Sequence, residues 1–322
     1  MNSLVSICIP TFRRPEFLSA ALESCAAQTY GSFEVVIGDD SPDDTSEQVV
    51  DRFRNRREWT ISYRRHTPSL GQNANVSDLF RRAQGDRIVL LHDDDRLLPN
   101  ALEDLSAPWA AFPDLALTFG RQEIITQSGD VDDDATEEHN TYFNRVGATG
   151  PKPNSIAVAL RLQIPNNGYM IRTDVARKVN YRSDDSVGVY CDTDFAIRLG
   201  ANLGANQMYF IDKLVSQYRL SDESISKSTN SRRAAHARAA VSIYEYVDSL
   251  PIARSSSTEM EFFRRHLIDK LVKGYAIAGR RKAALKFLLS GTYGWKRRTS
   301  RRGLYHLMLI CEPRLDRFRP YS

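Results

Sequence analysis

Three adjacent carboxylates, Asp93, Asp94 and Asp95, follow His92 at the end of the apolar run 87–91. A short run of this kind is typical of a buried strand, which places the acids at the strand's carboxyl end. Adjacent carboxylates repel one another and gain nothing from a hydrophobic core, so water or a divalent cation must neutralise them. Mg²⁺ and Mn²⁺ prefer oxygen ligands that they share with a phosphate. The cluster therefore predicts a metal and phosphate site, and a solvated acidic turn is the alternative.

A second pair of acids, Asp39 and Asp40, follows another apolar run at 33–37. Apolar patterning predicts strands at 4–9, 33–37, 60–63, 87–91 and 115–119, and helices at 17–25, 46–56 and 75–83. This alternation predicts an α/β fold with a mostly parallel sheet covered by helices on both faces. Both acidic groups then lie at the carboxyl edge of the sheet, where open α/β sheets bind ligands.

Two Gly-rich loops that hold phosphates are missing from the sequence. No G-x-G-x-x-G follows the first predicted strand, and no G-x-x-x-x-G-K-[ST] occurs. A phosphate must then be held by a cation and by side chains. With the two acidic groups at one edge, this indicates a nucleoside-diphosphate ligand.

The segments 5–14, 33–45 and 92–99 together resemble the family 2 glycosyltransferases in their order and spacing, and the resemblance extends over residues 1–225. It implies a GT-A fold, a nucleotide-sugar donor, transfer with inversion at the anomeric carbon, and Mn²⁺ or Mg²⁺ as cofactor. We expect a GT-A domain at 1–228, with a nucleotide-binding half at 1–120 and an acceptor half at 121–228. A helical basic region follows at 229–322.

The same resemblance implies roles for individual residues by position. The common family pattern is Asp-x-Asp-Asp-x-x-x-Pro. This sequence departs from it because His92 occupies the position of the first Asp. The nucleotide would be bound by Pro10, Thr11, Arg13, Asp39, Asp40, Asn73, Asn75 and Asp93. Asp94 and Asp95 would bind the metal, and Asn167, Gly168, Tyr169 and Asp194 would face the sugar or acceptor. A helix cap is the alternative role for the Asn-rich segment at 70–78.

Inverting transfer needs a base at the acceptor hydroxyl, and a carboxylate within hydrogen-bond reach suffices. Asp192 matches the base of a family element at the start of a helix, where Cys191 replaces the usual Glu. The alternative is that Asp192 caps this helix. We expect Asp194 to pair with Arg198 at i,i+4. Ser221 occupies a position where many members have His, and the acidic run 130–138 is expected to be a solvated, mobile loop.

The net charge of +4 on 322 residues conceals an asymmetry. Residues 264–322 contain sixteen Lys and Arg and three acidic residues. The first 263 residues contain 28 Lys and Arg and 37 Asp and Glu. Helical patterns are expected at 235–250, 260–278 and 281–289. Basic residues beside Trp295 and the apolar run 304–310 suit a helix on an anionic membrane surface. Packing on the chain's own domain or on a partner is the alternative, and no motif supports nucleic-acid binding.

Four cysteines without C-x-x-C spacing predict reduced thiols and no zinc site. No run approaches the ~20 apolar residues that span a bilayer, and the first residues do not form a signal peptide. We therefore expect a cytoplasmic enzyme, peripheral at the inner face of the plasma membrane, with a glycan, polysaccharide or lipid-linked oligosaccharide as acceptor. Two alternatives stay open: a sugar-1-phosphate nucleotidyltransferase, and a catalytically inactive nucleotide-sugar-binding protein.

Overall fold

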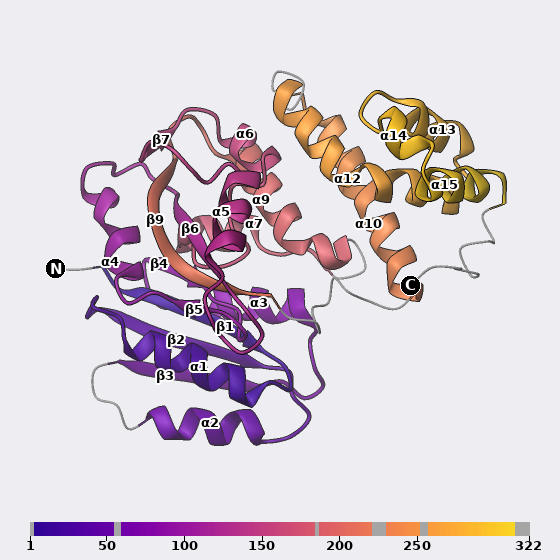
Figure 1. The fold of residues 1–322 in the computed structure, drawn as a ribbon. Helices are drawn as coiled ribbons and strands as arrows, with labels where there is room; N and C mark the ends of the chain where they lie inside the picture. The colour runs from indigo at the N-terminus through magenta and orange to yellow at the C-terminus, as the bar shows by residue number, and fades with distance from the viewer. Residues whose placement is uncertain (1–2, 55–58, 184–186, 221–229, 252–256, 313–322) are drawn as a thin grey trace.

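The computed structural model describes residues 3–54, 59–183, 187–220, 230–251 and 257–312 (Figure 1). Its strands are β1 (Val5–Thr11), β2 (Phe33–Asp39), β3 (Thr60–Arg65), β4 (Arg87–Leu90), β5 (Arg96–Leu97), β6 (Leu117–Ile125), β7 (Gly150–Lys152), β8 (Met170–Arg172) and β9 (Met208–Arg219). The α-helices among the sheet strands are α1 (Pro15–Ala26), α2 (Thr45–Arg54), α3 (Gln72–Arg82), α4 (Ala101–Ser106), α5 (Asp133–Tyr142), α6 (Ser155–Leu160), α7 (Thr173–Val179) and α9 (Cys191–Asn202). Short 3₁₀ helices are η1 (Ala107–Ala110) and η2 (Gly188–Tyr190).

These strands form one sheet in the order β3-β2-β1-β4-β8-β6-β9-β5, and β7 pairs with β9 at its side. Strands β1 to β4 pair in parallel, and β6 and β9 run in the same direction. The prediction of an α/β fold with a mostly parallel sheet is confirmed. Strands β8, β5 and β7 run antiparallel to their neighbours.

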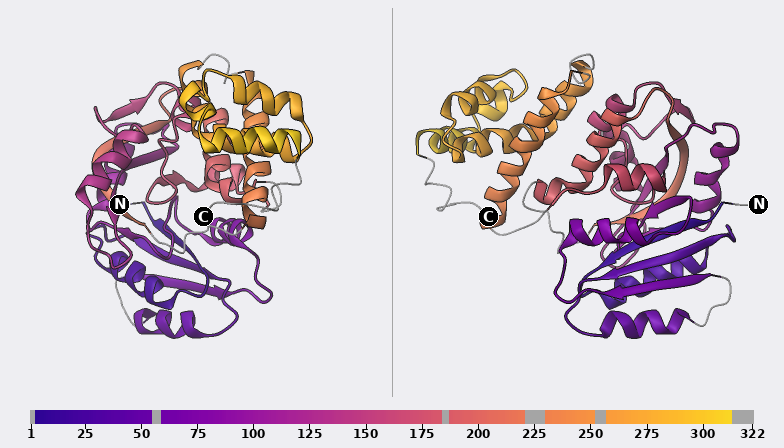
Figure 2. Two further views of the ribbon diagram at one scale, coloured as in Figure 1. Left: turned by 45° about the vertical axis from the view of Figure 1, so that its right-hand side comes forward. Right: turned by 180° about the vertical axis from the view of Figure 1, so that it is seen from behind.

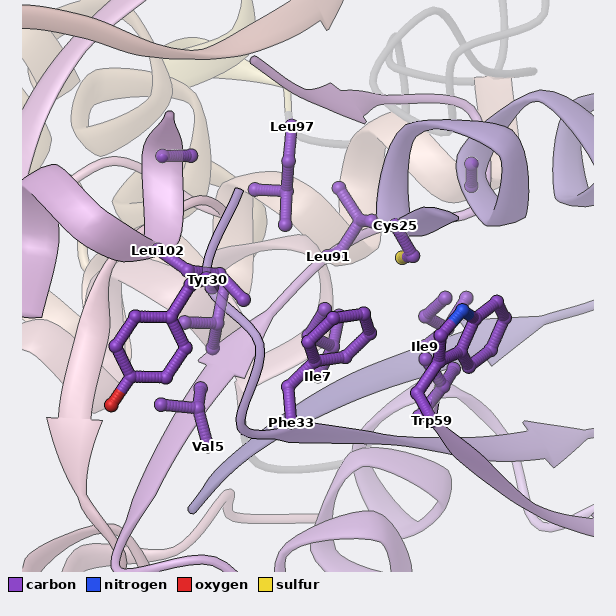
Figure 3. Packing of buried hydrophobic residues seen from close by; sticks show 14 of the residues in the cluster. Val5, Ile7, Ile9, Cys25, Tyr30, Phe33, Trp59, Leu91, Leu97 and Leu102 are labelled. Atoms are coloured by element: carbon purple, nitrogen blue, oxygen red, sulfur yellow. The ribbon is translucent and has the colours of Figure 1, made fainter. Parts of the chain in front are cut away.

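Strand β1 shows how alternate residues build two cores. Val5, Ile7 and Ile9 pack with α1, α2 and α4 on one face (Figure 3), whereas Cys8 packs with α3 and α9 on the other. Successive side chains of a strand point to opposite faces, so an apolar strand is buried on both sides. Cys8, Cys25 and Cys191 are buried, Cys311 is exposed, and none of the four forms a disulfide.

The C-terminal helices are α10 (Asn230–Ser249), α12 (Ser257–Ile277), α13 (Arg281–Leu289), α14 (Trp295–Arg298) and α15 (Arg301–Cys311). They lie together at one end of the molecule, away from α2 (Figures 1 and 2). A third core joins them to the acceptor half: Ile156 of α6 and Ile197 of α9 pack in one cluster with Leu267 and Leu271 of α12. The predicted helical region is therefore packed onto the first part of the chain. Among the residues described, none of the helices is both long and apolar enough to cross a membrane.

One prediction about local structure is wrong. The acidic run 130–138 was expected to be a loop, but helix α5 begins within it. Asp132 caps this helix, since its Oδ1 accepts from the Ala135 amide at 2.9 Å. Asp133 and Asp134 lie in the first turn, where negative charge favours a helix. Strand β6 also runs six residues past the predicted end at Phe119. Ser221 lies outside the described residues.

Candidate active site

The carboxyl ends of β1, β2 and β4 meet because these strands are neighbours. In the register, Thr11 pairs with Asp39, and Cys8 pairs with Leu90. Thr11 and Asp93 each lie three residues beyond Cys8 and Leu90, and Thr11 Oγ1 donates to Asp93 Oδ2 at 2.8 Å. A cleft of about 630 Å³ opens above this edge. Its lining includes predicted residues of both halves of the sheet: Pro10, Thr11, Asp40, Asn75, Asp93, Asp94 and Asp192.

The three acids after β4 have different surroundings. Arg14 Nη1 lies 2.7 Å from Asp94 Oδ2 and 3.4 Å from Asp93 Oδ1. Burial, with the Asp94 charge second, raises the pKa of Asp93 to about 6. Burial also raises the pKa of Asp95, whose oxygens accept from the Arg219 amide at 2.8 Å and from Asn167 Nδ2. Arg14 therefore offsets part of the negative charge of Asp93 and Asp94, and the Arg219 charge opposes the upward shift in the pKa of Asp95.

The residues of this cluster fit a divalent cation. Single ligand atoms of His92, Asp94 and Asp95 lie within 4.8 Å of one another. His92 Nε2 is buried and has no hydrogen-bond partner in the described part of the chain. Two carboxylates and an imidazole are a donor set that Mn²⁺ accepts, since carboxylate suits Mg²⁺ and Mn²⁺ and imidazole suits transition metals. Predicted ligands Asp94 and Asp95 thus come together with His92, which takes the place of the family's first Asp.

The wall formed by β2 and α3 is held by polar contacts. Asp40 Oδ1 accepts from His66 Nδ1 at 2.9 Å and from the Leu70 amide at 3.1 Å. Asn75 Nδ2 donates to the Gly38 carbonyl at 2.8 Å, and its Oδ1 lies where a Cβ at Gly38 would stand. Only glycine therefore lets Asn75 reach this position. The Asn75 Oδ1 atom is buried, and the structure gives it no hydrogen-bond partner.

The carboxylate at the acceptor side comes from helix α9. Asp192 lines the cleft, and its Oδ1 accepts from Tyr181 Oη at 2.8 Å. The alternative role as a cap is not supported, because the N-cap residue is Tyr190 and no side chain makes a cap bond there. Asp194, two residues further along the helix, is fully buried and pairs with Arg198 at 2.7 Å and with Arg182. The predicted pairing of Asp194 with Arg198 is confirmed.

Several predicted site residues lie outside the lining of the cleft. Arg13 has a left-handed backbone (φ 56°) and an exposed side chain, and the neighbouring Arg14 reaches the acids instead. Asp39 lies below the surface, where its oxygens accept from the Ser41 amide and Tyr63 Oη at 2.8 Å. Asn73 Nδ2 donates to the Arg182 carbonyl at 2.8 Å.

The segment at 166–170 also acts mainly through its packing. Asn167 holds Asp95, and the Tyr169 ring is 1% exposed within the core. Gly168 has a φ of 72°, and a Cβ there would overlap the Ser216 side chain. Asn166, its neighbour, is the residue of this segment that lines the cleft. Sugar contacts by Asn167, Gly168, Tyr169 and Asp194 stay predictions.

Some cleft residues were not predicted: Arg14, Gln122, His139, Phe143, Arg145 and His266. Arg14 could have been found, since it follows Arg13 in the same motif. The others come from β6, from α5 and the residues just after it, and from α12, and only the packing of distant elements brings them to the cleft. His266 is notable because it belongs to the C-terminal helices, so the region after residue 228 contributes a wall of the cleft.

Comparison with known proteins agrees with this geometry. Residues 6–152 match the family model described as Glycosyl transferase family 2. Abequosyltransferase RfbV of Salmonella typhimurium is 34% identical over 101 residues, which are 31% of this chain and 30% of that protein. The match to the curated relatives spans about a third of their own length.

Two solved structures share the fold over most of the chain. The crystal structure of S. aureus TarS 1–349 in complex with UDP has a TM-score of 0.63 at 17% identity, covering 88% of this chain and 80% of that one. The mannosyltransferase PcManGT from Pyrobaculum calidifontis, in complex with GDP-Man and Mn²⁺, has a TM-score of 0.59 at 13% identity, covering 100% and 89%. These likenesses confirm the predicted GT-A fold.

Proposed function

We propose that this protein transfers a sugar from a nucleoside-diphosphate donor to an acceptor hydroxyl, with inversion at the anomeric carbon. The observation that carries the proposal is that Asp93 and Asp94 of the acid cluster line the same cleft as the separate carboxylate of Asp192. The first group suits a cation and a diphosphate, and the second suits a base for an incoming hydroxyl. Binding of UDP and of GDP-Man by structures with this fold supports a nucleotide-sugar donor.

On the donor side, Asp40 and Asn75 line the part of the cleft next to β2, where the nucleoside would bind. Thr11 positions Asp93 by its hydrogen bond, and Arg14 is the cation nearest the diphosphate site. His92, Asp94 and Asp95 would hold Mn²⁺ or Mg²⁺, which supplies positive charge to the departing diphosphate. If Asp94 holds the cation, the Arg14 guanidinium would be available to a phosphate oxygen.

On the acceptor side, Asp192 would take the proton of the attacking hydroxyl. The acceptor oxygen forms a bond to the anomeric carbon while the bond from that carbon to the diphosphate oxygen breaks. The nucleoside diphosphate leaves with the electron pair. Tyr181 holds one Asp192 oxygen, which fixes the orientation of the carboxylate toward the cleft. Attack from the side opposite the leaving group gives inversion.

Two other functions were left open by the sequence. A sugar-1-phosphate nucleotidyltransferase should carry a Gly-rich, basic loop after its first strand, and the segment Pro10–Arg13 is a poor match to one. An inactive binding protein would keep the donor site and not depend on Asp192. The hydrogen bond from Tyr181 and the position of Asp192 in the cleft favour the transferase.

The membrane is the proposed partner of the last helices. Residues 281–311 contain eight Lys and Arg and no acid. Six exposed large apolar side chains lie in the same stretch: Leu285, Leu289, Trp295, Leu304, Leu307 and Met308. Trp295 alone is 71% exposed. We call these six residues with the surrounding Lys and Arg the basic apolar surface. Cations beside exposed Trp and Leu match an anionic bilayer surface, at about 1 kcal/mol per cation, and a lipid-linked acceptor would be met there.

Calorimetric titration with UDP, GDP, dTDP and CDP, with and without Mn²⁺, tests the donor site. We expect one nucleotide to bind in a Mn²⁺-dependent manner and Asp94→Ala to abolish that dependence. Asp104→Ala is the matched control, because Asp104 of α4 pairs with Lys213 of β9 and lies outside the cleft. Absence of binding by all four nucleotides, with and without Mn²⁺, would contradict the proposal.

A further inference from the structure

The cleft extends to a second polar group that the transfer reaction described above does not use. Arg145 follows helix α5 and lines the cleft together with Gln122 of β6, His139 of α5 and His266 of α12. Its side chain is buried, with 3% of the residue exposed. A guanidinium carries its charge throughout the physiological range. Arg145 is therefore a buried cation in the wall of a ligand site.

Neutral acceptors surround this guanidinium. Its Nε donates to the Gln163 carbonyl at 2.7 Å, and its Nη1 donates to Gln122 Oε1 at 2.7 Å. The same Nη1 lies 3.1 Å from His139 Nε2, and Nη2 makes a long contact of 3.4 Å with the Leu162 carbonyl. No carboxylate of the described chain segments lies within ion-pair distance of Arg145. These hydrogen bonds orient the guanidinium group of Arg145, but they do not neutralise its positive charge.

The neighbouring histidine does not change this balance. Burial, with the Arg145 charge second, lowers the pKa of His139 to about 3, so its ring is neutral and Nε2 can accept from Arg145. Burial likewise lowers the pKa of Arg145 to about 9. Arg14, another arginine of the cleft, differs because it faces the carboxylates of Asp93 and Asp94. Burying a cation without a counter-charge is unfavourable, and a ligand anion can relieve this cost.

Tyr218 connects this group to the reacting centre. Its ring stacks on His139 with centroids 5.7 Å apart. Burial chiefly raises the pKa of Tyr218 to about 12; the charges of Asp95, Asp94 and Asp192 add to this effect, and the Arg145 charge opposes it. Tyr218, which also lines the cleft, is thus close enough to feel the charges of both Arg145 and the carboxylates.

We propose that Arg145 binds an anionic group of the acceptor, a phosphate or a carboxylate, while the acceptor hydroxyl faces Asp192. This inference rests on the proposed transfer and adds the substrate class: acceptors that carry a negative charge near the reacting sugar. Gln122 and Tyr218 supply neutral polar neighbours for the same group. The donor's diphosphate has its own cations at the acid cluster, so Arg145 selects the acceptor rather than the donor.

The test uses the full chain loaded with Mn²⁺ and the nucleoside diphosphate that binds in the titration above. Methyl glucoside 6-phosphate, methyl glucuronide and neutral methyl glucoside are titrated separately by calorimetry. We expect at least one anionic probe to bind about tenfold or more tightly than the neutral one, and the better probe distinguishes phosphate from carboxylate. Arg145→Gln should remove this preference, and Arg145→Lys should keep part of it.

Arg121→Gln is the matched control, because Arg121 adjoins Gln122 on β6 but pairs with Asp212 and lies outside the cleft lining. It should leave the preference unchanged. Equal binding of the three probes by the wild-type protein would overturn the inference, and so would a preference that survives Arg145→Gln. If Arg145→Gln does not fold, the wild-type comparison and Arg145→Lys decide. If the protein prefers the anionic probe but binds no nucleotide, the transferase proposal is contradicted and the anion site is still supported.

Discussion

Asp192 and Asp194 lie two residues apart on helix α9 and have opposite surroundings. Asp192 faces the cleft and accepts one hydrogen bond from Tyr181 at 2.8 Å. Asp194 is fully buried between the guanidinium groups of Arg182 and Arg198. The first turn of one helix therefore presents one acid to a ligand and uses the other to hold the helix against the segment 179–182.

Replacing Asp192 by Asn should abolish transfer without unfolding the protein. The amide keeps the shape and still accepts from Tyr181, but it cannot take a proton. We expect the transfer rate to fall by about 10²- to 10⁴-fold, with the Kd of the nucleotide unchanged. Single-turnover transfer and calorimetric binding measure the two quantities. A variant that keeps the wild-type rate would show that another group is the base.

Replacing Asp194 by Asn should have the opposite effect. The change leaves two guanidinium groups without their carboxylate, and breaking a buried pair costs about 3–5 kcal/mol. Urea unfolding followed by circular dichroism should show this loss in the free energy of unfolding. Asp192→Asn is the internal control, with a change near zero. Equal stability of both variants would contradict the structural role of Asp194.

Removing Trp295 should weaken binding to anionic vesicles. Its exposed indole is the largest apolar group of the basic apolar surface. Losing its burial in the bilayer should reduce the partition constant by about tenfold or more. Co-sedimentation with phosphatidylglycerol vesicles compares wild type, Trp295→Ser and Val131→Ser, since Val131 is 47% exposed in a different part of the chain. Equal binding of both variants, or wild-type binding only to phosphatidylcholine, would contradict the membrane proposal.

The pH dependence of stability should report on His266. The pKa of His266 is lowered to about 4 from its ordinary value near 6.5. Burial is the main cause, and the Lys270 charge is the second. Between these values the unfolded chain binds more protons, so the contribution to stability is complete above pH 6.5 and is lost as the pH falls toward 4. The stability difference between wild type and His266→Gln should therefore shift in favour of the variant on acidification. Urea unfolding at pH 7, 6, 5 and 4 measures it, and a constant difference would contradict it.

Local patterning was enough to predict the donor half of the sheet and the residues at its edge. Asp93, Asp94 and Thr11 could be placed because each lies at or just beyond the carboxyl end of a strand, and a parallel sheet aligns such positions. The nucleotide contact of Arg13 stays a prediction: its side chain is exposed, and the neighbouring Arg14 contacts the acids. The backbone of Arg13 is left-handed (φ 56°), a local conformation that the residue types alone do not reveal.

The acceptor side could be predicted only in part. Asp192 was found by resemblance, whereas Gln122, Arg145 and His266 have no local signal of function. They lie up to 144 residues apart in the sequence and reach one cleft through the packing of β6, α5 and α12. The acidic run 130–138 was predicted to be a solvated loop, but Asp132 caps a helix that begins within it. Long-range packing and a single cap bond account for what the sequence did not reveal.

The core shared by α6, α9 and the C-terminal helices has a consequence for synthesis of the chain. Ile156 and Ile197 emerge from the ribosome long before Leu309 and Ile310, which belong to the same cluster. At about 5–20 residues per second, more than a hundred residues take roughly 5–20 s. For that time the nascent protein presents an apolar face on an otherwise formed sheet domain. The acceptor wall with His266 is thus among the last parts to be completed, and a chaperone that shields this face would act within that interval.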